Sequence, residues 1–199
     1  MEGKRHTAYF YGDSNTYGYD PRGLLGGRYP AEHRWADVLA EELKDSWMIL
    51  ANGMNGRQIP ASDFDYTVFE RSLRKAETAF REAGLGFDLF AVMLGTNDYE
   101  YMWGPNVPAV TARMEKFLLY LKAQPALAET RILLIAPPLL LERDLFTESY
   151  RALAEKHGTD FMSAAELRPE MAFDGEHLTE RGSLEFAGHL KDYLCTISL

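Results

Sequence analysis

Three side chains in this sequence have the types and spacing needed for nucleophilic catalysis. Ser14 lies in Gly12–Thr16 (GDSNT), directly after an apolar run, while Asp174 and His177 lie three residues apart near the other end of the chain. A serine hydroxyl becomes a good nucleophile when an imidazole accepts its proton and a carboxylate holds the other ring nitrogen. On a tight turn Asp174 can reach the imidazole locally, which leaves the opposite nitrogen of His177 free to face Ser14. The pattern predicts acyl transfer.

Acyl transfer also needs donors for the negative charge that builds on the carbonyl oxygen. The candidate donors are the backbone N–H of Ser14, the backbone N–H of Gly56 and the side-chain amide of Asn97. Glycine suits such a position because its backbone can approach a substrate closely and adopt unusual dihedral angles. These three groups predict an oxyanion hole.

The elements that must position these groups follow from the apolar pattern. Short apolar runs alternate with longer segments of helical spacing, which indicates βαβ units around a parallel sheet. The predicted strands are Thr7–Tyr11, Trp47–Ala51, Leu89–Leu94, Arg131–Ala136 and a weaker fifth near Thr159–Met162. Helical spacing is found in Arg34–Lys44, Phe69–Phe80, Met114–Leu121, Leu145–Lys156 and Thr179–Tyr193. Gly158 follows the fourth of these helices in the position of a C-terminal cap. The glycine- and proline-rich stretch Asp20–His33 predicts a long loop beside the first strand.

Polar segments follow three of the predicted strands. In open parallel sheets a ligand crevice lies beyond the carboxyl ends of the strands, where the strand order reverses. With the order 2-1-3-4-5, the first and third strands flank this point, and the segments Gly12–Thr16, Asn52–Gly56 and Gly95–Asp98 converge there. Asp13 and Asp98 are predicted to brace these loops rather than to take part in chemistry.

Composition limits the partners and the setting. A chain of 199 residues with 46% apolar residues fits one domain, 1–199, with a sizeable core. The net charge of −9 argues against nucleic acid or an anionic membrane as a partner and suits a small molecule. With Cys195 as the single cysteine and no apolar leader, the expected setting is the cytoplasm.

The blocks Gly12–Thr16, Gly95–Asp98 and Asp174-x-x-His177 resemble those of the SGNH (GDSL-like) hydrolase family, in this order and across nearly the whole chain. The resemblance implies an α/β fold, a three-layer α/β/α sandwich with a five-stranded parallel sheet in the flavodoxin-like order 2-1-3-4-5. It also implies a serine esterase with Ser14, Asp174 and His177 as the triad and Ser14, Gly56 and Asn97 as the oxyanion hole.

The family's second block, which corresponds here to Gly53–Arg57 and precedes the third block Gly95–Asp98, allows two glycines as the oxyanion donor, Gly53 and Gly56. Gly56 is preferred because Gly53–Arg57 looks like the block of small arylesterases and acyltransferases, in which the residue before the arginine gives the N–H. That subgroup implies short acyl esters, acetate above all, and no metal or organic cofactor. It includes assemblies, so a homo-oligomer is an open expectation. Simple arylesterase activity, carbohydrate O-acetylesterase activity and acyl transfer to alcohols remain alternatives.

Aromatic residues crowd the loops after the first and third strands. They are Tyr17, Tyr19, Tyr99, Tyr101 and Trp103. Such residues can form a substrate pocket, although aromatics beside a crevice also close the core. Tyr17, Tyr99, Tyr101 and Trp103 are the candidate substrate-binding residues.

Two other classes of function compete with the esterase. A metallophosphoesterase could use Asp13, Asn97, Asp174 and His177 as ligands, but it usually needs more His and Asp residues at fixed spacings. A non-catalytic carbohydrate-binding protein would not need a complete triad. Activity that is insensitive to a chelator would argue against the metallophosphoesterase. Detectable ester turnover would argue against the binding protein.

Overall fold

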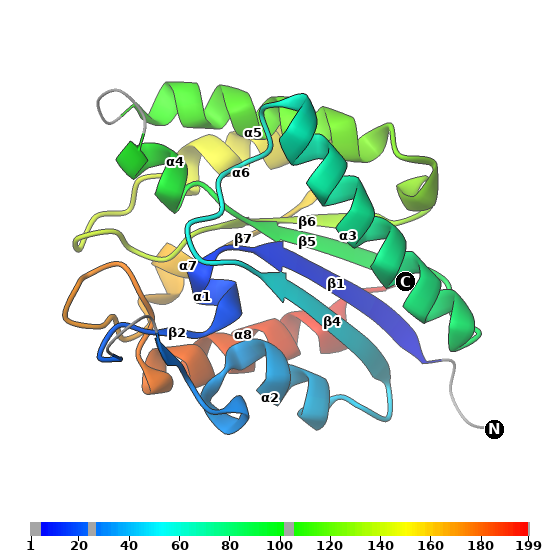
Figure 1. The fold of residues 1–199 in the computed structure, drawn as a ribbon, viewed down its shortest axis with the longest axis horizontal. Coiled ribbons are helices and arrows are strands. Elements are labelled where there is room, and N and C mark those ends of the chain that lie inside the picture. Colours follow the sequence, from blue (N-terminus) through cyan, green and yellow to red (C-terminus); the bar gives the residue numbers. More distant parts are fainter. Residues whose placement is uncertain (1–4, 24–26, 102–105, 199) are drawn as a thin grey trace.

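Five parallel strands form one sheet in the computed structural model, which describes residues 5–23, 27–101 and 106–198 (Figure 1). The strands are β1 His6–Gly12, β4 Trp47–Gly53, β5 Leu89–Met93, β6 Arg131–Ala136 and β7 Asp160–Ser163. Their order is β4-β1-β5-β6-β7. Counted along the chain, this is the order 2-1-3-4-5, so the predicted α/β topology is confirmed, with strand ends shifted by at most two residues.

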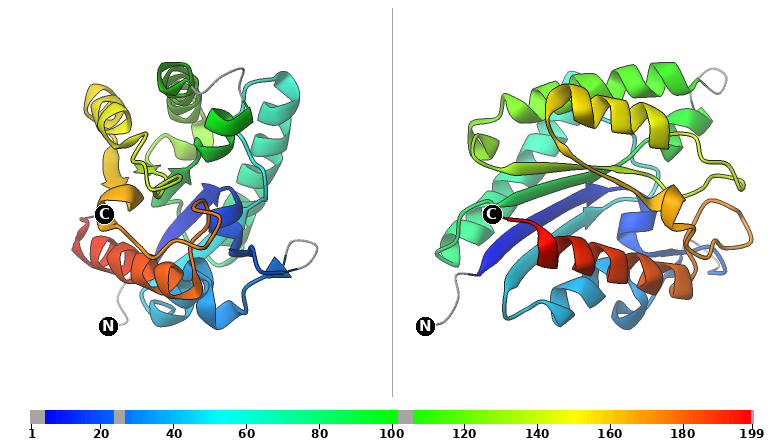
Figure 2. Two further views of the ribbon diagram at one scale, coloured as in Figure 1. Left: turned by 90° about the vertical axis from the view of Figure 1, so that its left-hand side faces the viewer. Right: turned by 180° about the vertical axis from the view of Figure 1, so that it is seen from behind.

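Helices cover both faces of the sheet, as Figures 1 and 2 show. On one face lie α3 Asp63–Glu82, α5 Val107–Lys122 and α6 Thr147–His157, and on the other α2 Trp35–Glu42 and α8 Glu180–Thr196. Side chains alternate across a strand, so Tyr9 and Tyr11 of β1 join the first core while Ala8 and Phe10 join the second. Burial on both faces explains why these strands are nearly continuous apolar runs.

Local signals fix the ends of several helices. The Ser62 side chain caps α3 and exchanges hydrogen bonds with Asp65 in a capping box. Gly158 ends α6 in the left-handed conformation, with φ of 60°, as predicted. Four-residue and six-residue helices, however, carry too little periodicity to be found in a sequence. These are α1 Ser14–Tyr17, α4 Thr96–Tyr101 and α7 Ala164–Leu167.

The predicted loop Asp20–His33 is more ordered than expected. Strands β2 Tyr19–Asp20 and β3 Gly27–Arg28 pair antiparallel, and a short 3-10 helix, η1, covers Ala31–His33; a second, η2, covers Pro125–Leu127. The buried Tyr29 hydroxyl donates to the Leu178 carbonyl at 3.2 Å, which ties this region to the segment after His177.

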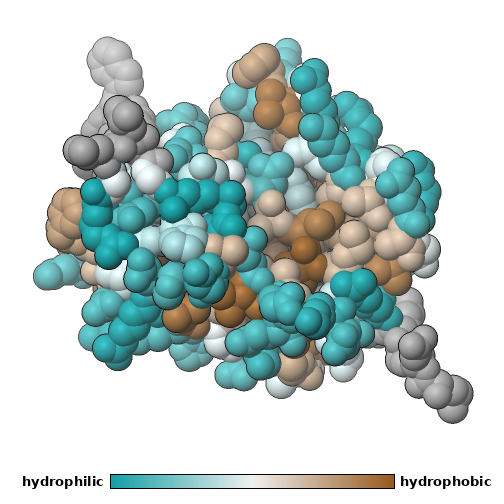
Figure 3. Space-filling model, turned by 60° about the horizontal axis from the view of Figure 1, so that its bottom comes forward, coloured by the Kyte–Doolittle hydropathy of each residue, from teal (hydrophilic) through white to brown (hydrophobic). Residues whose placement is uncertain are grey.

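The outer side of β4 is not paired with another strand of this sheet. A cavity of about 450 Å³ lies along it, lined among others by Ile49, Leu50 and Ala51 of the strand. The face seen in Figure 3 is mainly hydrophilic, with a small hydrophobic area near its centre. In the segments that the structure describes, no helix is both long and apolar enough to cross a membrane.

Candidate active site

The three predicted loops meet at the carboxyl end of the sheet. Gly12, the last residue of β1, pairs in register with Gly53 of β4 and with Met93 of β5. The segments that follow these three strands therefore start side by side. Ser14 and Asn97 then lie in the first turns of the short helices α1 and α4. The topology places the candidate nucleophile and oxyanion donors at the predicted switch point.

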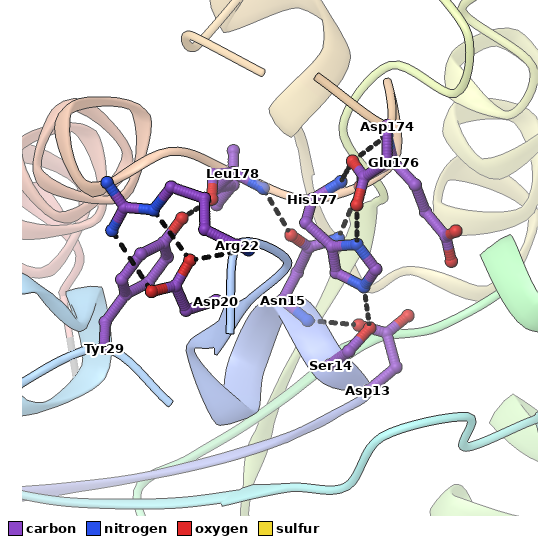
Figure 4. A network of polar contacts seen from close by, with 10 residues as sticks. All are labelled: Asp13, Ser14, Asn15, Asp20, Arg22, Tyr29, Asp174, Glu176, His177 and Leu178. Carbon is purple, nitrogen blue, oxygen red and sulfur yellow. Dashed lines mark hydrogen bonds and ion pairs between the residues drawn. The ribbon is translucent and has the colours of Figure 1, made fainter. Parts of the chain in front are cut away.

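Ser14, His177 and Asp174 form a continuous line of hydrogen bonds (Figure 4). The distance from Ser14 Oγ to His177 Nε2 is 2.9 Å, and that from His177 Nδ1 to Asp174 Oδ2 is 2.8 Å. Ser14 is 4% exposed and His177 9% exposed, so the contact between them is shielded from water. The three residues meet although 160 positions separate Ser14 from Asp174 in the sequence. The structure thus brings these three candidate residues together.

The ionisation of Asp174 decides the direction of these hydrogen bonds. Burial opposes its charge, but the N–H of Glu176, the ring of His177 and the N–H of His177 outweigh burial and lower the pKa of Asp174. An ionised carboxylate only accepts hydrogen bonds, so His177 Nδ1 must carry the proton. The lone pair of Nε2 is then free to accept the proton of the Ser14 hydroxyl. This is the tautomer that a general base requires.

Asp13 stands beside the nucleophile and braces the loop, as predicted. It is 1% exposed, and one carboxylate oxygen accepts the N–H of Asn15 at 3.0 Å, which caps α1. Burial raises the pKa of Asp13 to about 7, although the Asn15 N–H and the nearby His177 and Arg57 favour its ionised form. Between about pH 4 and pH 7 this side chain therefore takes up a proton on folding.

Replacing Asp13 with asparagine should change how stability depends on pH. The folded-state pKa is raised above the ordinary value of 3.8, so the contribution of Asp13 to stability falls as pH rises from about 4 to about 7. Asparagine keeps an oxygen for the Asn15 N–H and does not ionise. Relative to wild type, the free energy of unfolding of Asp13→Asn should therefore grow over this window by up to about 4 kcal/mol. Denaturant unfolding between pH 4 and 8 measures this, and a constant difference between the two proteins contradicts it.

The two glycines of the second block have different environments. A Cβ on Gly53 would lie 2.1 Å from the backbone nitrogen of Tyr17, so Gly53 is required for close packing of β4 against α1. Gly56 has φ of 71°, and apart from its two chain neighbours no atom of the described residues lies within 4 Å of where its Cβ would be. A positive φ in open space is what a glycine that presents its N–H to a ligand would show. The structure favours Gly56 over Gly53 as the candidate donor.

Contacts of Asn97 and Arg57 join the segment Gly53–Arg57 to the segment Gly95–Asp98. The Asn97 amide donates one hydrogen bond to the Arg57 carbonyl at 3.1 Å, and Asn97 is 3% exposed. The buried guanidinium of Arg57 donates to the Gly12 carbonyl at 2.6 Å and to Asn52 Oδ1 at 2.7 Å, and it lies 4.1 Å from the centre of the Tyr11 ring. Arg57 was not a candidate site residue in the sequence, yet its side chain links the ends of β1 and β4.

Asp98 braces the third block. It is fully buried and accepts hydrogen bonds from the Ile59 N–H at 3.0 Å and from Arg113 Nη1 at 2.9 Å. Burial raises the pKa of Asp98 to about 6 against these two favourable partners. Asp98 thereby fixes α4, which carries Asn97, to the segment that follows Gly56. The prediction of a bracing role is supported by these contacts.

Two of the four candidate substrate-binding aromatics, Tyr17 and Tyr99, make contacts that the structure describes. Tyr17 lies under the Arg28 guanidinium at 4.4 Å, and Tyr99 packs edge-on against Phe146 at 6.3 Å between ring centres. Trp103 and the side chain of Tyr101 lie outside the described residues. Among the described residues, Tyr19 contacts the site, because the centre of its ring lies 4.5 Å from the centre of the His177 ring.

The four side chains of the metal hypothesis are engaged in hydrogen bonds. Asp174 and His177 contact each other, Asp13 caps α1, and Asn97 donates to a backbone carbonyl. Within the described ranges, no group of three or more His, Cys, Asp or Glu side chains is arranged to hold a metal ion.

A serine, histidine and aspartate aligned at the carboxyl end of a parallel sheet define a class of hydrolases with a serine nucleophile. The comparisons with known proteins agree with this class. The model of the GDSL-like lipase/acylhydrolase family matches residues 10–184. The chain belongs to this family and is a carboxylic ester hydrolase, as the resemblance implied.

Solved structures of esterases superpose over nearly the whole chain. A protein from Agrobacterium tumefaciens assigned as an arylesterase is 27% identical, with a TM-score of 0.79 over 96% of this chain and 99% of that one. A carbohydrate acetylesterase family member from Sinorhizobium meliloti is 25% identical, with a TM-score of 0.76 over 94% and 96% of the two chains. An aryl esterase from Mycobacterium smegmatis shares the fold at 20% identity, with a TM-score of 0.78 over 98% and 100%. The comparison with curated proteins gave no match.

Proposed function

We propose that the protein hydrolyses short-chain acyl esters, acetates above all, through an acyl-enzyme on Ser14. The observation that carries this proposal is the line of hydrogen bonds from Ser14 Oγ through His177 to Asp174, at 2.9 and 2.8 Å. His177 acts as general base and acid, and Asp174 holds its ring. The oxyanion donors are the N–H groups of Ser14 and Gly56 and the amide of Asn97.

The reaction proceeds in two acyl transfers. Ser14 Oγ attacks the ester carbonyl carbon while its proton passes to His177 Nε2, and the carbonyl oxygen becomes an oxyanion held by the three donors. The carbon–oxygen bond to the alcohol then breaks, and His177 gives the proton to the departing alkoxide. A water molecule, deprotonated by the same nitrogen, repeats the attack on the acyl-enzyme and releases the carboxylic acid and free Ser14.

The preference for acetate is supported by the solved structures of related esterases. One relative at 25% identity is a carbohydrate acetylesterase family member, and one at 27% is assigned as an arylesterase. Removal of acetyl groups from sugars is therefore the second candidate, with the same catalytic residues. Acyl transfer differs only in the acceptor, because an alcohol would replace water in the second step. Action in the cytoplasm and assembly into a homo-oligomer stay predictions.

Hydrolysis of p-nitrophenyl esters of increasing acyl length tests this proposal. With chelator present, kcat/KM should be highest for the acetate and lower by about tenfold or more for the octanoate, because the short acyl pocket that we propose would exclude longer chains. Acetylated sugars and added alcohols, assayed in parallel, separate deacetylation from acyl transfer. A preference for the long ester would contradict the short-chain proposal, and activity that the chelator abolishes would favour the metal alternative.

A further inference from the structure

The residue after the candidate nucleophile, Asn15, is buried and bonded to the distant segment that carries His177. It is 4% exposed. Its amide nitrogen donates to the Glu176 carbonyl at 3.1 Å, and its amide oxygen accepts the Leu178 N–H at 2.9 Å. These two backbone groups belong to the residues on either side of His177. The Asn15 side chain is therefore hydrogen-bonded to the backbone on both sides of His177 (Figure 4).

Asn15 is itself held firmly in the core. Its N–H donates to Asp13 at 3.0 Å, and its carbonyl accepts the indole N–H of Trp35 at 2.8 Å. Trp35 is 1% exposed, and its backbone N–H donates a hydrogen bond to Ser183 Oγ of α8 at 2.8 Å. The amide is thus fixed relative to Ser14, its neighbour in α1. A fixed donor and acceptor can set the position of the segment that they bind.

Asp174 and Asn15 control different aspects of His177. Asp174 lies in the same turn as His177. Its carboxylate accepts a hydrogen bond from the ring Nδ1–H of His177 at 2.8 Å and one from the backbone N–H of His177 at 3.1 Å, which sets the orientation of the ring within the turn. Asn15 instead joins that turn to α1. The separation of Ser14 Oγ from His177 Nε2, 2.9 Å here, depends on how the turn sits on α1.

We infer that Asn15 is a positioning residue that sets the distance over which the Ser14 proton passes to His177, an inference that rests on the proposed function. A shift of about 1 Å between reacting groups can cost about 100-fold in rate. The substrate does not need this contact in order to bind. Loss of the Asn15 amide should therefore lower kcat and leave KM nearly unchanged.

Two variants with different chemistry test the inference. Asn15→Leu keeps a similar volume and removes both hydrogen bonds, while Asn15→Asp keeps an acceptor for Leu178 and loses the donor for Glu176. With p-nitrophenyl acetate, kcat of both should fall about 10- to 100-fold, with KM within about twofold of wild type. The matched control is Tyr29→Phe, which removes a hydrogen bond to the Leu178 carbonyl from the other side and should keep kcat within about twofold.

A proton NMR measurement separates positioning from general structural support. The low-field resonance of the His177–Asp174 hydrogen bond should persist in at least one Asn15 variant while its kcat falls. The inference is overturned if both variants keep kcat, if Tyr29→Phe loses as much as they do, or if the resonance disappears together with kcat in both. The proposed function fails separately, when wild-type turnover does not exceed that of Ser14→Ala.

Discussion

Replacing His177 with alanine should lower kcat for p-nitrophenyl acetate by about 10⁶-fold, nearly as far as replacing Ser14. In the structure, Nε2 of His177 is the acceptor for the Ser14 proton at 2.9 Å, and without it the hydroxyl has no base. Members of a triad act as a unit, so their losses do not add. The double variant Ser14→Ala/His177→Ala should therefore be no less active than either single variant. Steady-state assays of the three proteins measure this.

The control for this prediction is His189→Ala, a histidine that is exposed on α8. It should retain wild-type kcat. A His177→Ala variant that keeps kcat within about tenfold of wild type would contradict the assignment of His177 as the base, because a general base alone contributes about 100-fold or more.

Replacing Asn97 with alanine should lower kcat by about 100- to 1000-fold, with a much smaller effect on KM. The amide nitrogen carries two hydrogens, and the Arg57 carbonyl accepts one of them at 3.1 Å. That contact holds the amide in place, and the second hydrogen is the proposed donor to the oxyanion. Because the charge on the oxygen develops only in the transition state, its loss acts on kcat.

Gln58→Ala is the matched control for Asn97. The Gln58 side chain donates to the backbone carbonyl of Asn97 at 3.2 Å, so its removal disturbs the same segment without deleting the amide. We expect a change in kcat of less than about tenfold. If Gln58→Ala and Asn97→Ala lose activity equally, or if the Asn97 variant changes KM alone, Asn97 does not stabilise the oxyanion.

The sheet and its order were predictable because they depend on strong, regular signals. Each parallel strand is buried on both faces and gives an apolar run, and a right-handed crossover leaves few ways to connect the runs. The convergence of Ser14, Gly56 and Asn97 follows from that order together with the crevice rule. His177 and Asp174 were singled out because a carboxylate three residues before a histidine can hold its ring on a tight turn, and because the pair resembles a block of the family.

Features that depend on tertiary contacts were not predictable in the same way. The hydrogen bonds of Asn15 join atoms 161 and 163 positions apart, and nothing in the local sequence indicates them. Leu141 and Glu142 have φ of 48° and 63° in a turn where glycine or asparagine would be expected. The Leu141 N–H donates to the Gly175 carbonyl at 2.7 Å, next to Asp174, so a long-range contact holds this conformation.

The aromatic prediction shows the same limit. Composition indicated that aromatic residues gather near the crevice, but it could not tell which ring reaches the base. Tyr99 packs against Phe146, whereas Tyr19, which was not among the candidate binding residues, contacts His177. Tyr19 belongs to β2, which pairs with β3, and the sequence predicted only a long loop from Asp20 onward in this region.

Covalent labelling of the wild-type protein with a fluorophosphonate, followed by intact mass and peptide mapping, tests whether Ser14 is the nucleophile. We expect one adduct per chain, on the peptide that contains Ser14, with no adduct on Ser14→Ala and much slower labelling of His177→Ala. Labelling at another residue, or equal labelling of Ser14→Ala, would contradict the assignment of Ser14 as the nucleophile.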